Sequence, residues 1–148
     1  MRQHSLPPLI KTLVASTAYT STTTTSAFSM PVADSYEVII NATTVTGTSP
    51  TCDSQLSTSV DGGTTYITLP LRSTQITAAG KSVMVFKLGL GGNEVALEST
   101  AAATGGTLAK NCIFDPKYMK LTHTIGGTNP SFTIVVYGAF LPAGSNSI

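Results

Sequence analysis

Residues 132–141, FTIVVYGAFL, decide the fold, because no other segment of the chain has so strong a β propensity. The largest apolar side chains recur with the two-residue period of a strand, at Phe132, Ile134, Val136 and Phe140. Between them stand Thr133, Val135 and Tyr137, which are also large. The pattern therefore predicts a β-strand that is buried on both of its faces.

Outward from this strand, β-prone runs alternate with turn residues. Residues 126–130, GGTNP, predict the turn that separates it from a preceding strand at 118–125. Residues 47–50, GTSP, likewise predict the end of a strand. Residues 61–63, Asp-Gly-Gly, predict a hairpin, because these residue types tolerate the positive φ of tight turns. Further strands are predicted at residues 9–19, 36–45, 52–60, 66–71 and 83–88, with weaker ones at 95–97 and 107–114.

Helix signals are nearly absent from the chain. The one Ala-rich run, residues 101–103, is flanked by Thr and Gly and indicates a loop. About eight strands with turns between them, and no alternation of strand and helix, predict an all-β fold. We expect an antiparallel β-sandwich, which buries this much Val, Ile, Leu and Phe between two sheets. Strand count does not separate a jelly-roll from an Ig-like topology.

The chain divides into two expected parts. Residues 1–30 predict an extended N-terminal arm or a first strand, and they include a Ser/Thr-rich tract at 21–26. Residues 31–148 predict a single β-sandwich domain. An arm that adds a strand to a neighbouring chain gains backbone hydrogen bonds without side-chain specificity, so this segment favours assembly.

Charge is scarce in this sequence. Only 10% of the 148 residues are charged, the net charge is +1 and the mean hydropathy is +0.23. Such a chain offers no strong field to nucleic acid or to an anionic membrane, and we expect neither partner. An uncharged, Thr-rich β surface tends to associate. We therefore expect an oligomer or a protein bound in a lattice.

Catalytic patterns are missing from the sequence. The histidines are His4, in the N-terminal segment, and His123, in a predicted strand. A catalytic triad needs a base that is oriented by a carboxylate and lies beside a nucleophile, and no Gly-x-Ser-x-Gly elbow occurs. The seven acidic residues are scattered, and no metal-ligand spacing or phosphate-binding loop is present. We expect no enzyme, no catalytic or metal residues, and no cofactor.

The two cysteines are Cys52 and Cys112. Sequence alone does not decide whether they pair, because a disulfide depends on geometry. Two cysteines do not make a disulfide scaffold, and the simpler interpretation is two small buried apolar residues.

Two stretches of the sequence resemble a known class. They are residues 46–53, TGTSPTCD, continuing to 59–66, SVDGGTTY, and residues 118–122, YMKLT, continuing to 125–133, IGGTNPSFT. The combination resembles small virion structural proteins of tailed bacteriophages, in the decoration (cement), neck or tail accessory β-sandwich class. Tyr66 stands where that class often has Trp, and Cys52 stands where it has an aliphatic residue. The resemblance covers less than half of the chain and brings no catalytic residues with it.

The resemblance implies a non-enzymatic virion protein, assembled in the host cytoplasm. We expect a capsid decoration (cement) protein that binds and stabilises the phage head through the major capsid protein, as a homo-oligomer with a trimer favoured. A neck, collar or tail accessory protein, binding another virion protein, is the alternative within the class. A carbohydrate-binding or adhesion module is an alternative of another class, with a stacking face drawn from Tyr19, Tyr36, Tyr66, Tyr118 and Tyr137.

Overall fold

The computed structural model describes residues 7–88, 95–96 and 115–142, and this part of the chain is all-β and antiparallel, with no helix. The all-β prediction is thereby confirmed. In chain order the strands are β1 (Leu9–Tyr19), β2 (Thr23–Thr24), β3 (Ala33–Ser59), β4 (Tyr66–Arg72), β5 (Gly80–Leu88), β6 (Val95–Ala96) and β7 (Met119–Pro142). The weak strand predicted at 107–114 lies outside the described residues, as do Cys112 and His4.

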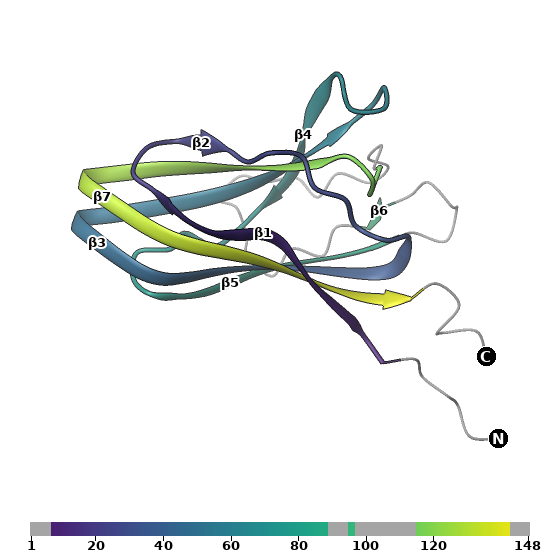
Figure 1. Ribbon diagram of the computed structural model, residues 1–148, viewed down its shortest axis with the longest axis horizontal. Coiled ribbons are helices and arrows are strands. Elements are labelled where there is room, and N and C mark those ends of the chain that lie inside the picture. The colour runs from purple at the N-terminus through teal and green to yellow at the C-terminus, as the bar shows by residue number, and fades with distance from the viewer. Residues whose placement is uncertain (1–6, 89–94, 97–114, 143–148) are drawn as a thin grey trace.

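Two long strands form a central ribbon. β3 and β7 pair from Ala33 opposite Pro142 to Thr58 opposite Met119. The shorter strands add to its sides, with β1 and β2 on β7, β4 and β5 on β3, and β6 on β5. Figure 1 shows the ribbon folding back on itself at the left, far from both chain ends. Residues distant in sequence are therefore neighbours throughout the fold.

Two predicted strand ends prove to be bends. Residues 47–50 and 126–130 were expected to separate strands, but the ladder continues through them, with Thr48 opposite Thr128. Gly47 and Gly127 have φ of 113° and 109°, and the residues two places later also have positive φ. Because both strands bend at the same point of the ladder, the pairing survives the bend. Each predicted pair of strands is one long strand, β3 or β7.

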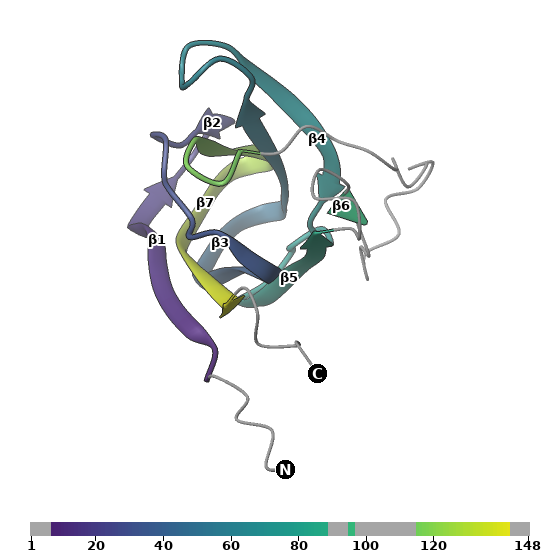
Figure 2. The ribbon, with the colours of Figure 1, turned by 90° about the vertical axis from the view of Figure 1, so that its right-hand side faces the viewer.

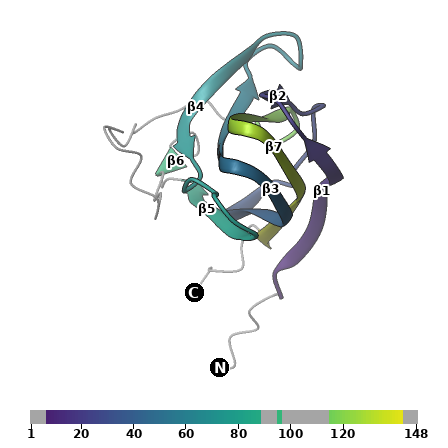
Figure 3. The same ribbon diagram turned by 90° about the vertical axis from the view of Figure 1, so that its left-hand side faces the viewer.

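The bend divides the sheet into two arrays of paired strands. The first array contains β1, residues 131–142 of β7, residues 33–46 of β3, and β5, with the short β6 paired to β5. The second array contains β2, residues 119–126 of β7, residues 51–59 of β3, and β4. Figures 2 and 3, seen along the long axis, show the strands curving around a common interior.

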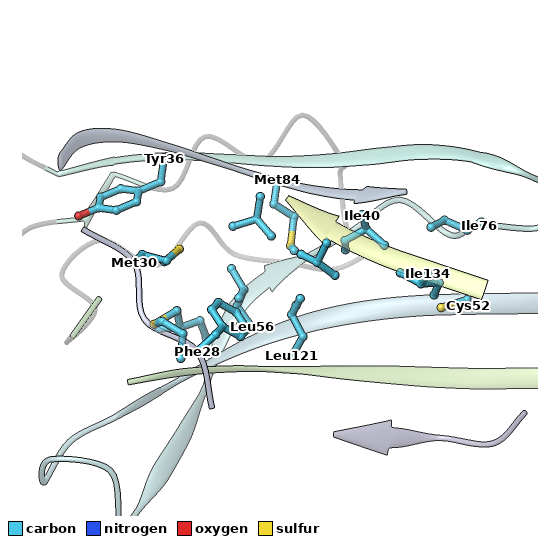
Figure 4. Close-up of a cluster of buried hydrophobic side chains, with 14 of the residues drawn as sticks. Phe28, Met30, Tyr36, Ile40, Cys52, Leu56, Ile76, Met84, Leu121 and Ile134 are labelled. Carbon is cyan, nitrogen blue, oxygen red and sulfur yellow. The ribbon is translucent and has the colours of Figure 1, made fainter. Parts of the chain in front are cut away.

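The core lies in that interior and takes side chains from both arrays (Figure 4). From the first array, Tyr36 packs edge to face on Phe140 with ring centroids 5.7 Å apart. Leu56 and Leu121 of the second array are fully buried. The connection between β2 and β3 adds Phe28, whose backbone exchanges two hydrogen bonds with Met119. Burial of these side chains is the main stabilising contribution to such a fold.

The N-terminal segment forms the edge of the first array. β1 pairs with β7 from Leu9 opposite Phe140 to Tyr19 opposite Phe132, with register shifts around Val14. Most of its side chains are exposed, and Tyr19 is the residue of β1 that is buried in the core. Lys11 donates a hydrogen bond to the Ser29 carbonyl at 3.2 Å. β1 is thus held by backbone pairing, by the buried Tyr19 ring, and by Leu13 and Val14, which are partly buried against the core.

Candidate functional site

A buried serine–histidine pair is the nearest approach to catalytic chemistry in the described residues. Ser54 of β3 and His123 of β7 are cross-strand partners, and Ser54 Oγ lies 2.7 Å from His123 Nδ1. The Sγ atom of Cys52 lies 3.9 Å from the same hydroxyl, and the ring of Tyr19 stands 4.7 Å from the imidazole. Sequence reasoning missed this pair, because only the register of β3 on β7 brings the two residues together.

The surroundings of this pair are those of a core, not of a reaction centre. Ser54 and His123 have no exposed surface, so no path for a substrate leads to them. His123 Nε2 is buried and has no hydrogen-bond partner among the described residues. Burial lowers the pKa of His123 to about 4, which keeps the imidazole neutral. Within the described ranges, no carboxylate orients the ring, as a catalytic base requires.

The acidic residues of the described part are spread over separate local structures. Asp61 closes the predicted hairpin between β3 and β4, where its Oδ1 accepts hydrogen bonds from the backbone N–H groups of Thr64 and Thr65 at 3.1 and 2.6 Å. These bonds, above all the one from Thr65, lower the pKa of Asp61. Asp53 instead accepts a hydrogen bond from the Gln75 side chain. Among the described residues, no three His, Cys, Asp or Glu side chains gather as a metal site would require.

The tyrosines that the sequence offers as a sugar-stacking face lie in different places. Tyr19 and Tyr36 are buried in the core, and burial raises the pKa of Tyr36. Tyr66 lies on the second array, with Lys120 Nζ 4.2 Å from its ring centroid. Tyr118 lies beside Gly63 of the hairpin, and Tyr137 belongs to the first array. The five rings do not form one platform.

The outward side of the first array is a continuous surface of four paired strands, β1, β7, β3 and β5. Along β3 and β7, alternate residues enter the core and the others face away from it, as the two-residue period requires. Val135 shows this clearly, because both its neighbours belong to the core cluster and it does not. Val135 is nevertheless only 8% exposed. At this position the structure agrees with the prediction that both faces of residues 132–141 are buried.

Cross-strand register aligns the outward residues in rows. Directly paired residues point to the same side of an antiparallel sheet. In order across β1, β7, β3 and β5, the rows are Ile10, Ala139, Glu37 and Val85; Thr12, Tyr137, Ile39 and Val83; and Val135, Asn41 and Lys81, where β1 has no member. We call these eleven residues the outer face.

The outer face is mainly apolar. Ile10 is 68% exposed, and Ile39, Val83, Val85 and Tyr137 are each partly exposed. Its charged residues are Glu37 and Lys81, both exposed. A sheet face of this composition contacts water poorly and suits contact with another protein, because contiguous apolar surface of this kind marks interaction sites. Chemically, it can bind a second apolar surface.

Two further findings concern the chain as a whole. In the part of the chain that the structure describes, no helix has the length and apolar character needed to cross a membrane. No protein-family model, curated protein or solved structure matches this chain.

Proposed function

We propose that this protein is a non-enzymatic structural component of a phage virion, and that it acts as a decoration (cement) protein on the head. The observation that carries the proposal is the outer face, a sheet surface of four strands with eleven aligned residues and only two charges. A surface of this kind is built for contact with protein. The resemblance of residues 46–53, 59–66, 118–122 and 125–133 to small virion proteins supports the phage head, and with it the major capsid protein, as the place where this protein assembles.

The pairing order supports a jelly-roll β-sandwich. When each half of β3 and β7 is counted as a strand, the first array has the order β1, β7, β3, β5, with the two-residue β6 beyond β5, and the second has β2, β7, β3, β4. Two four-stranded sheets joined by strands that run from one into the other are typical of a jelly roll, an architecture used in viral capsid and lectin domains. An Ig-like sandwich distributes its strands differently.

Low charge supports an assembly role. With a net charge of +1 and 10% charged residues, the free protein has little electrostatic repulsion to oppose association. A homo-oligomer bound to a shell would cover part of its apolar surface. Contact cores in protein interfaces are depleted of charge in the same way.

The test is to look for the protein in particles and to add it back. Mass spectrometry of purified virions of the encoding phage is expected to detect the chain at a copy number comparable with that of the major capsid protein. Heads that lack the chain should bind the purified protein and resist heat better afterwards. Absence from purified virions would overturn the proposal, and binding confined to the neck or tail would replace decoration with an accessory role.

A further inference from the structure

We infer that the outer face pairs with the same face of a second copy of this chain, around a two-fold axis near Ile39 and Val83. This inference deepens the proposed function, because it assigns the outer face to contact between copies on the head and leaves contact with the major capsid protein to other surfaces of the chain. Ile39 and Val83 are cross-strand neighbours in the central row of the face. The axis would lie between the two copies, in the plane of their contact and perpendicular to the line that joins Glu37 to Lys81.

The positions of the two charges support a two-fold axis. Glu37 is one row to one side of the Ile39 row, and Lys81 is one row to the other side, on the adjacent strand. Strand spacing and rise place their Cα atoms about 14 Å apart in a regular sheet, too far for a direct salt bridge within one chain. A two-fold axis between them exchanges their positions. Glu37 of each copy then faces Lys81 of the other, which gives two ion pairs across the contact.

Apolar residues occupy the space between these charges. Ile39 and Val83 lie nearest to the axis, with Tyr137 and Val85 beside them, and all four are partly exposed in the single chain. An apolar centre flanked by complementary charges is the usual anatomy of a specific protein contact. A three-fold contact would instead join two different patches of the surface.

The size of the face determines how strong the pairing is. Four strands and three rows cover about 20 Å by 20 Å, or about 400 Å² per copy. This area is about half of the roughly 800 Å² per partner that stable complexes bury. We therefore expect a weak dimer in solution, with a Kd on the order of 10–100 µM. On a shell, where neighbouring copies are held close, the same contact would be largely occupied.

Analytical ultracentrifugation of the full chain over a range of concentrations tests the pairing. We expect a monomer–dimer equilibrium in which Glu37→Lys and Lys81→Glu each raise the Kd about tenfold, since each change places like charges opposite one another twice. The double variant should recover the original Kd, because the exchange restores both ion pairs. Failure of the double variant to recover would overturn the two-fold arrangement.

A neutral pair of variants separates this face from apolar surface in general. Ile39→Thr is expected to raise the Kd about tenfold, because its side chain lies beside the axis in both copies. Val60→Thr is the matched control, since Val60 is 45% exposed on the hairpin and lies away from the outer face. Equal effects of the two changes would contradict the inference, as would a trimer mass or a monomer at every concentration. A dimer that is absent from virions would overturn the proposed function and leave the dimer intact.

Discussion

Gly47 and Gly127 occupy equivalent positions in the bend of the central ribbon, and each packs against the backbone of the other strand. A Cβ atom on Gly47 would lie 2.7 Å from the Asn129 carbonyl oxygen, and one on Gly127 would lie 2.7 Å from that of Ser49. The surrounding sequences correspond without a gap, TVTGTSPT at 44–51 and TIGGTNPS at 124–131. The bend therefore has local two-fold pseudosymmetry. In each strand a glycine allows the positive φ and the close approach of the opposite backbone.

Alanine at either glycine is expected to lower the free energy of unfolding by about 2–4 kcal/mol, because both positive φ and a backbone collision oppose the new side chain. Urea denaturation of Gly47→Ala and Gly127→Ala measures the loss. Gly62→Ala is the control, since Gly62 has φ +75° but a Cβ there would meet nothing within 4 Å. That variant should lose only about 1 kcal/mol. Three equal losses would show that backbone collision plays no part.

Stability is expected to fall by about 3 kcal/mol between pH 6.5 and pH 4 because of His123. In the unfolded chain this imidazole takes up a proton near its ordinary pKa of 6.5, whereas burial holds the folded pKa at about 4. The unfolded state therefore binds more protons across this window, so stability is complete above pH 6.5 and is lost as the pH falls. Urea denaturation across this pH range measures the loss.

His123→Gln is the matched variant for that measurement. Glutamine keeps a polar side chain beside Ser54 but cannot titrate. Between pH 6.5 and pH 4, the stability of the variant should therefore fall by about 3 kcal/mol less than that of the unmodified protein. Both proteins share His4 and all carboxylates, and these contribute equally to the two profiles. Parallel profiles would contradict the assignment of the loss to His123.

Local sequence predicted the strands better than it predicted their ends. Periodicity identified 132–141, because its core face is an uninterrupted alternation of large apolar residues. Turn residues at 47–50 and 126–130 predicted strand ends, yet both strands continue through a bend. Whether such residues end a strand or bend it depends on what lies opposite. Here the opposite strand bends at the same place, which no local pattern could reveal.

The candidate surface and the buried pair were harder to predict for a related reason. Strand alternation alone assigned Val135 and Tyr137 to the second side of their strand. Only the register with β3 and β5 aligns them with Ile39 and Val83 as one face. The contact of Ser54 with His123 likewise depends on pairing between segments far apart in the chain. Pairing partners, not residue types, carry this information.

Truncating Tyr19 is expected to loosen β1. Tyr19→Ala removes the buried side chain that anchors this strand, and the loss should be about 3 kcal/mol. Hydrogen exchange of the β1 amides, with urea denaturation, measures both the local and the global effect. Ile10→Ala is the control on the same strand, because Ile10 is 68% exposed and its truncation should cost no more than about 0.5 kcal/mol. Similar exchange in the two variants would show that backbone pairing alone holds β1.

The Cys52 thiol is expected to resist modification while the protein is folded. Cys52 is fully buried and free, and burial raises its pKa to about 11, so that little reactive thiolate exists near neutral pH. In a Cys112→Ser background, a thiol reagent should modify Cys52 about 100-fold more slowly in buffer than in denaturant. The rate for an accessible thiol comes from Thr68→Cys, because Thr68 is exposed. This variant is made in a chain whose two native cysteines are replaced by serine. Rapid modification of Cys52 in buffer would mean that the region around Ser54 and His123 opens readily, and the loss of stability assigned to His123 would then be smaller.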